Sequence, residues 1–122
     1  MNVTLGAVEA AGNLFREGRQ LEQVFVALER RGAALPHADL RAAIRQADAF
    51  RSQVYRLGVD TFGDHVMTPG HSTALVTGGW LRNADQFVGR DPQGAVRAVR
   101  TGHEMLDKSM DEVLAALRRN IA

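Results

Sequence analysis

The sequence predicts an all-α protein that folds as a four-helix bundle, and three observations lead to this prediction. Apolar residues recur at spacings of three and four along most of the chain, which is the period of an amphipathic helix. Three stretches rich in glycine, proline and polar residues, at 32–36, 58–72 and 89–92, divide this pattern into four segments. No stretch shows the alternation of a half-buried strand. Four amphipathic helices joined mostly by short connections favour an antiparallel bundle.

The composition fits a single globular domain over residues 1–122, with 45% hydrophobic and 24% charged residues. The formal net charge is +1, which favours neither nucleic acid nor a membrane surface as a partner. The absence of cysteine excludes disulfides, thiolate metal sites and cysteine nucleophiles. We find neither a secretory signal nor a run of about 18 uncharged apolar residues, and therefore expect a cytoplasmic protein.

The first two helices are expected at about Thr4–Arg31 and from Pro36 to Gly58. Proline suits the first turn of a helix and glycine suits the position after its end. In the first helix the apolar and small residues alternate four and three apart, as in a heptad seam. The seam consists of Ala7, Ala11, Leu14, Gly18, Leu21, Phe25, Leu28 and Gly32. The stripe of the second helix consists of Leu40, Ala43, Ala47, Phe50, Val54 and Leu57.

The third helix is expected to start at Ser72 as its N-cap and to end before Gly89. Its apolar face is assigned to Val76, Trp80, Ala84 and Phe87. The fourth helix opens with Asp91 and Pro92, an N-cap followed by a proline in the first turn. It is expected to reach about Ile121, with a second heptad seam. That seam contains Val99, His103, Leu106, Met110, Val113, Leu117 and Ile121.

The expected 58–72 loop is the longest irregular segment, and loops of this length are often functional. It contains His65 and His71, with Asp60 and Asp64 nearby. Two histidines six residues apart match no tight metal-binding spacing. We therefore interpret them as ordinary polar residues of a loop, with one of them capping the third helix. The sequence leaves open whether this loop is ordered.

Gly78 and Gly79 directly precede Trp80 inside the third expected helix. Two adjacent glycines destabilise a helix, so close packing or a bend must offset them. Our interpretation is an interface at which a neighbouring helix or a second copy of the chain approaches the backbone. The alternative is a ligand that lies on the bare backbone.

His103 and Asp107 are the candidate metal ligands, because an imidazole and a carboxylate four residues apart share one helix face. Glu104 adds a carboxylate on the same helix, and Glu22 or Asp48 is the candidate partner from another helix. The alternative is a histidine at the edge of the core that is hydrogen-bonded to a polar neighbour. No nucleophile elbow and no phosphate-binding glycine loop occurs, so we expect no catalytic residues.

Several short motifs resemble those of bacterial ferritin-like four-helix bundles that form a domain of unknown function. They are Leu57-Gly58-Val59-Asp60 with the loop that follows, Gly79-Trp80-Leu81, and Gly102-His103-Glu104. The resemblance covers about half of the chain by motif and all of it by helix layout. It implies a ferritin-like bundle and, with it, a di-iron centre.

A di-iron centre of that kind takes a Glu from each of two helices and a Glu-x-x-His pair from each of the other two. No Glu-x-x-His occurs here; the fourth helix offers Glu104 and Asp107, and the second has Arg51 three residues after Asp48. Two functions therefore remain. The first is a non-catalytic module that acts by association, as a homodimer or higher oligomer or with another protein. The second is an iron- or manganese-binding protein with a reduced carboxylate and histidine site.

Overall fold

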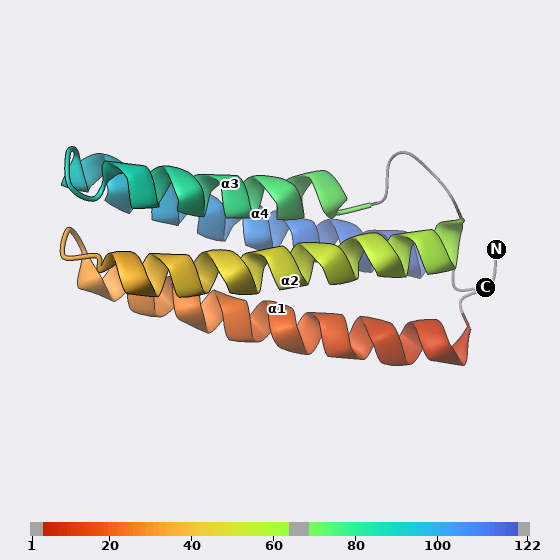
Figure 1. Ribbon diagram of the computed structural model, residues 1–122. Coiled ribbons are helices and arrows are strands. Elements are labelled where there is room, and N and C mark those ends of the chain that lie inside the picture. The colour runs from red at the N-terminus through yellow and green to blue at the C-terminus, as the bar shows by residue number, and fades with distance from the viewer. Residues whose placement is uncertain (1–3, 64–68, 120–122) are drawn as a thin grey trace.

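A computed structural model describes residues 4–63 and 69–119, and this part of the chain consists of four α-helices without a β-strand (Figure 1). Their bounds are Leu5–Arg31 for α1, His37–Phe62 for α2, His71–Phe87 for α3 and Pro92–Arg119 for α4. The all-helical class and the number of helices predicted from the periodicity are confirmed. None of these helices combines the length and the apolar character needed to cross a membrane.

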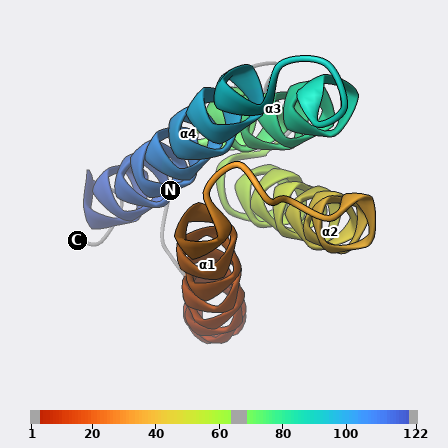
Figure 2. The same cartoon turned by 90° about the vertical axis from the view of Figure 1, so that its left-hand side faces the viewer.

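The helices occupy the corners of a four-membered bundle, in which each one packs against two neighbours (Figure 2). The packed pairs are α1 with α2, α2 with α3, α3 with α4, and α1 with α4. The turn at 32–36 and the turn at 88–91 lie at the same end of the molecule (Figure 1). The contact between α1 and α4 brings the C-terminal half of α1 beside the middle of α4, where the candidate site lies.

The core is built from the predicted heptad positions. Leu21, Val54, Val99 and Leu106 are almost completely buried, with exposed fractions of 0–1%. Phe25 and Phe50 are the largest buried side chains. Burial of one such side chain contributes about 1.5–3 kcal/mol. The seams of α1, α2 and α4 are therefore the main source of stability, as the apolar spacing indicates.

Two helix starts follow the expected capping chemistry. The hydroxyl of Thr4 accepts a hydrogen bond from the amide of Ala7 at 3.1 Å and caps α1. Oδ1 of Asp91 accepts one from the amide of Gly94 at 3.0 Å, directly before the proline that begins α4. In both cases a side-chain oxygen satisfies an amide that has no partner within the helix.

The expected end of α2 and the expected start of α3 were wrong. The helix continues through Gly58, which is buried, and ends at Phe62 before Gly63, whose φ is +85°. One glycine costs a helix about 1 kcal/mol, and the burial of the neighbouring Leu57 offsets that cost. At the other side α3 begins at His71, not after Ser72. The connection is thus shorter than 58–72, and its residues 64–68, including His65, lie outside the described residues.

Helix α3 also presents a different face to the core from the one expected. Its buried positions are Ala74, Thr77, Gly78, Leu81 and Ala84, whereas Val76 is 41% exposed. The buried positions of α4 include the small residues Gly94, Ala95, Ala98, Gly102 and Ser109, and α3 and α4 are the most closely packed pair of helices. The core-facing side of α3 was misjudged because small residues line it, and alanine and glycine contribute little to an apolar pattern.

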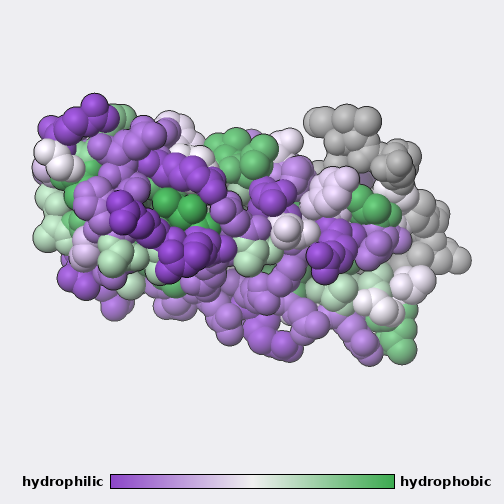
Figure 3. All heavy atoms as spheres, in the orientation of Figure 1, coloured by the Kyte–Doolittle hydropathy of each residue, from purple (hydrophilic) through white to green (hydrophobic). Residues whose placement is uncertain are grey.

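The outer surface is mostly polar. Hydrophilic residues dominate the face in Figure 3, and apolar residues appear there as separate groups. The large apolar side chains with the greatest exposure are Leu5, Val8, Tyr55, Leu75, Val76 and Leu114.

Candidate metal centre

Three potential ligands meet where α1 packs against α4. They are Glu22 from α1 and His103 and Asp107 from α4, and their donor atoms all lie within 4.8 Å of one another. Oε2 of Glu22 is 3.7 Å from Nε2 of His103, and Oδ2 of Asp107 is 3.9 Å from the same nitrogen. The cluster therefore combines two carboxylates and one imidazole nitrogen around a common point.

Helical periodicity places these side chains. His103 and Asp107 are four residues apart and lie one above the other on α4. On α1, Glu22 and Glu29 are seven residues apart, which is two turns, and both lie beside the apolar seam. The acids of α1 thus flank the histidine of α4 at the rim of the core.

The ring of His103 rests on the core. It stacks on Phe25 with ring centroids 5.4 Å apart and planes inclined by 13°. Gly102 makes room for Phe25, because a Cβ at that glycine would lie 3.1 Å from the phenyl ring. The side chain of His103 is only 19% exposed, so one ring face is fixed by apolar packing while its nitrogens face polar groups.

Glu29 occupies the other nitrogen of the ring. Its Oε1 lies 2.6 Å from Nδ1 of His103. An ionised carboxylate only accepts hydrogen bonds, so Nδ1 is the donor of this bond. Nε2 then points toward Glu22 and Asp107.

The clustered charges shift the pKa values of His103 and Asp107. Partial burial, a hydrogen bond with Glu22 and the negative charge of Glu22 raise the pKa of Asp107 to about 6. Partial burial lowers the pKa of His103, but the hydrogen bond and charge of Glu29 and the charges of Asp107 and Glu22 outweigh it. The net shift of the His103 pKa is upward. The site therefore attracts a positive charge, either protons or a cation.

The separations leave room for one metal ion. Ligands that each lie about 2.1 Å from one ion are about 3.0–3.4 Å apart at octahedral or tetrahedral angles. The distances of 3.7 and 3.9 Å to Nε2 need only a small inward rotation of Glu22 and Asp107 to reach that range. Both carboxylates are partly exposed, so such a rotation meets little resistance.

The structure brings together three of the five metal-ligand candidates. Glu104 is exposed on α4 and lies outside the cluster, because one residue along a helix turns the side chain by about 100°. Asp48 forms an ion pair with Arg82 at 2.7 Å and thus joins α2 to α3. Neither residue belongs to the candidate site.

The clustered residues do not fit a di-iron centre. Within the described residues the cluster has three ligands, which come from two helices, whereas a ferritin-type centre draws on all four. Asp48 is held by Arg82, and Asp85, the acid of α3, contacts His37 and Arg41. The donor set fits one ion held between α1 and α4.

The predicted interface residues have separate environments. A Cβ at Gly78 would lie 3.3 Å from Asp48 and 3.2 Å from Arg82. This glycine therefore allows α3 to pack against α2 of the same chain. Beyond its chain neighbours and the backbone of its own helix, no described atom lies within 4 Å of the position that a Cβ would take at Gly79. Trp80 is half-buried and packs across Gly102 of α4. Of the two predicted interface glycines, Gly79 is therefore the one with open surroundings.

His71 lies at the start of α3, away from the cluster. Its Nε2 is 3.4 Å from a guanidinium nitrogen of Arg51, and its ring lies beside Tyr55. Burial and the charge of Arg51 lower the pKa of His71. A neutral ring with a cation at this distance is a poor cation site. The interpretation of His71 as a polar loop residue was wrong, because His71 is the first residue of α3, and no side chain caps the start of that helix.

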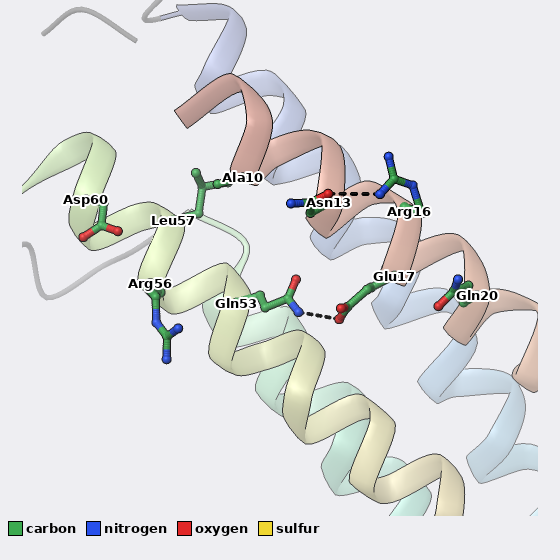
Figure 4. Close-up of a pocket in the computed structure, with 9 residues that line it drawn as sticks. All are labelled: Ala10, Asn13, Arg16, Glu17, Gln20, Gln53, Arg56, Leu57 and Asp60. Carbon is green, nitrogen blue, oxygen red and sulfur yellow. Dashed lines mark hydrogen bonds between the residues drawn. The ribbon is translucent and has the colours of Figure 1, made fainter. Parts of the chain in front are cut away.

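A groove of about 440 Å³ runs between α1 and α2, and polar side chains line most of it (Figure 4). Gln53 donates a hydrogen bond to Glu17 at 2.5 Å, and Arg16 donates one to Asn13 at 3.0 Å. Arg16 and Arg56 point away from one another (Figure 4). Because these groups are paired or divergent, they do not converge on a common ligand position.

Sequence reasoning missed Glu29 and the role of Phe25. The seven-residue spacing of Glu22 and Glu29 next to an apolar seam resembles the flanking charges of a coiled coil, which face the neighbouring helix. That pattern would have pointed to both glutamates once α4 was identified as the neighbour. Which helix lies beside α1 depends on the tertiary order.

Comparisons of the chain with protein-family models, with curated proteins and with solved structures found no match.

Proposed function

We propose that the protein is a metal-binding helical bundle that holds one divalent first-row metal ion between α1 and α4. Glu22, His103 and Asp107 are the ligands. The observation that carries the proposal is the convergence of their donor atoms within 4.8 Å. Two ionised carboxylates and a neutral imidazole supply two negative charges, which match a divalent cation.

The donor set indicates the class of ion. Imidazole nitrogen suits zinc, iron, copper and nickel, while carboxylate oxygen suits manganese, calcium and magnesium. A mixed set of one nitrogen and two oxygens favours iron(II), manganese(II) or zinc(II). Three protein ligands leave further positions for water, and the partial exposure of Glu22 and Asp107 gives water access.

For the architecture we propose an antiparallel up-down-up-down bundle, in which the short connection between Phe62 and His71 takes the place of the long crossover of ferritin-like folds. Two pairs between α1 and α2 support the direction, since Glu17 meets Gln53 and Arg31 meets Asp39. The partners advance in opposite directions along the chain, as antiparallel neighbours do. The proposed centre differs from the ferritin type because it holds one ion and uses two helices.

Manganese binding tests this function. Free Mn²⁺ gives a strong paramagnetic resonance signal that weakens when the ion is bound, so a titration of metal-free protein counts the sites. We expect one site per chain, and Glu22→Gln should weaken binding at least tenfold. Glu104→Gln is the matched control, because it removes one carboxylate from the same surface without touching the cluster.

Two results would refute the proposal. One is wild-type protein that binds neither Mn²⁺ nor Zn²⁺ at micromolar concentration. The other is equal weakening by Glu22→Gln and Glu104→Gln, which would indicate attraction by surface charge in general.

A second candidate function is association with another copy of the chain. The observation that favours it is an apolar strip on α3, where Leu75 is 53% and Val76 41% exposed. Gly79 lies one turn further on the same face, and Tyr55 of α2 is exposed beside the start of α3. Sedimentation of the wild type against Leu75→Lys tests it; an unchanged monomeric mass for both would contradict it.

A further inference from the structure

We infer that Glu29 is a positioning residue for the metal ligand His103. By accepting a hydrogen bond from the Nδ1–H group it fixes one tautomer of the imidazole and directs the lone pair of Nε2 toward Glu22 and Asp107. The inference rests on the proposed metal function and deepens it, because it assigns a group outside the ligand set to the control of affinity.

The contacts of the two ring nitrogens carry this inference. Oε1 of Glu29 lies 2.6 Å from Nδ1, whereas both proposed ligand oxygens face Nε2 at 3.7 and 3.9 Å. A neutral imidazole has one donor and one acceptor nitrogen. With the donor engaged by Glu29, the acceptor is the nitrogen inside the cluster.

Packing against Phe25 helps to fix the orientation of the His103 ring. The near-parallel stack, with planes inclined by 13°, limits tilting of the ring, and the bond to Glu29 limits its rotation in the plane. Only the space beside Gly102 allows Phe25 to lie under the histidine. The nitrogen lone pair is therefore oriented before any ion arrives.

Glu29 cannot also serve as a ligand in this geometry. Nδ1 and Nε2 point away from one another across the ring, so a carboxylate bound to Nδ1 lies on the side opposite the cluster. A carboxylate that accepts the second N–H of a ligand histidine raises its basicity and fixes its orientation. Loss of such a partner typically weakens metal binding 10- to 100-fold.

The test compares Glu29→Ala and Glu29→Gln with the wild type, with Glu104→Gln again as the surface control. Mn²⁺ affinity is measured by titration, and the tautomer of His103 is read from ¹⁵N NMR of the zinc-loaded protein. Circular dichroism confirms that each variant is folded. Glu29 is on the bundle surface, and Gln keeps an amide oxygen that still accepts a hydrogen bond from the Nδ1–H group.

We expect Glu29→Ala to weaken Mn²⁺ binding 10- to 100-fold and Glu29→Gln to retain most of the affinity. The wild-type spectrum should show the proton on Nδ1 and the metal on Nε2. Unchanged affinity in Glu29→Ala would overturn the inference while leaving the metal function intact. Complete loss in both variants would also overturn it, because Glu29 would then be a ligand. Absence of binding in the wild type would instead refute the proposed function itself.

Discussion

Phe25 and His103 stack across the α1–α4 interface, so a core phenylalanine supports the one histidine of the candidate centre. The sequence offered two interpretations of His103, a core-edge residue with a polar neighbour and a metal ligand. The structure combines features of both, since the ring lies on the core and both nitrogens face carboxylates. Substitutions of His103 and Asp107 in the metal-free protein separate the structural contribution of this histidine from its proposed role as a ligand.

Replacement of His103 by leucine should lower the stability of the metal-free protein at pH 6 by about 1 kcal/mol. The hydrogen bond with Glu29 is lost, and three carboxylates remain without their cation. Because the folded-state pKa of His103 lies above its usual 6.5, its stabilising charge is present below pH 6.5 and disappears as the pH rises through the raised value.

Urea unfolding at pH 6 and at pH 9 measures this difference. The deficit of His103→Leu should be larger at pH 6 than at pH 9. A variant that is as stable as the wild type at pH 6 would mean that apolar contact with Phe25 outweighs the polar contacts.

Replacement of Asp107 by asparagine should stabilise the metal-free protein above pH 6. The folded-state pKa of about 6 exceeds the usual 3.8, so the folded state binds this proton more tightly than the unfolded state. The contribution of Asp107 to stability therefore falls as the pH rises from about 4 to about 6. Asparagine removes the repulsion by Glu22 and, with it, this pH dependence.

Thermal unfolding of Asp107→Asn in the presence of a chelator checks this at pH 4, 5, 6 and 7.5. The variant should exceed the wild type in melting temperature at pH 7.5 and match it near pH 4. Glu104→Gln should show no comparable trend. A variant less stable at pH 7.5 would contradict the charge repulsion.

Most of the fold was predictable because long amphipathic helices have a clear period. The heptad positions Leu21, Val99 and Leu106 are buried as expected. The sequence was least informative where small residues pack, as on α3, and where one glycine was taken as the end of a helix. For the site, spacing along α4 identified His103 and Asp107. Glu22 was one of two candidate partners, and the choice between Glu22 and Asp48 depended on which helix lies beside α4. Glu29 was missed, because the contact between the first and last helix is a property of the tertiary arrangement.

Replacement of Gly79 by alanine should stabilise the protein by about 1 kcal/mol, since alanine favours a helix and the position is open. The interface interpretation of Gly78 and Gly79 implies that a leucine at Gly79 would disturb the packing around Trp80. Because a Cβ at Gly79 meets nothing within 4 Å beyond its chain neighbours and the backbone of its own helix, we expect little disturbance within one chain. Sedimentation of Gly79→Leu then reports on association alone, and a smaller species than the wild type would support an interface here. A lower melting temperature for Gly79→Ala would contradict the open environment.

Replacement of Gly70 by alanine should destabilise the protein by at least about 2 kcal/mol. Its φ is +78°, and a Cβ would lie 2.6 Å from Val113 and 2.8 Å from the carbonyl oxygen of Ser109. In addition, the backbone carbonyl of Gly70 accepts a buried hydrogen bond from the hydroxyl of Ser109 at 2.7 Å. Gly32→Ala is the control, because its φ is also positive but its surroundings are open. Equal losses in the two variants, measured by urea unfolding, would show that contact with α4 is unimportant.

The most direct test of the metal centre is a crystal structure of protein soaked with Zn²⁺, with data collected on both sides of the zinc absorption edge. We predict one anomalous peak per chain between α1 and α4, about 2.0–2.2 Å from Nε2 of His103 and from one oxygen each of Glu22 and Asp107. Glu29 should remain hydrogen-bonded to Nδ1. Crystals with no peak at this position, or with zinc bound through Nδ1, would contradict the account.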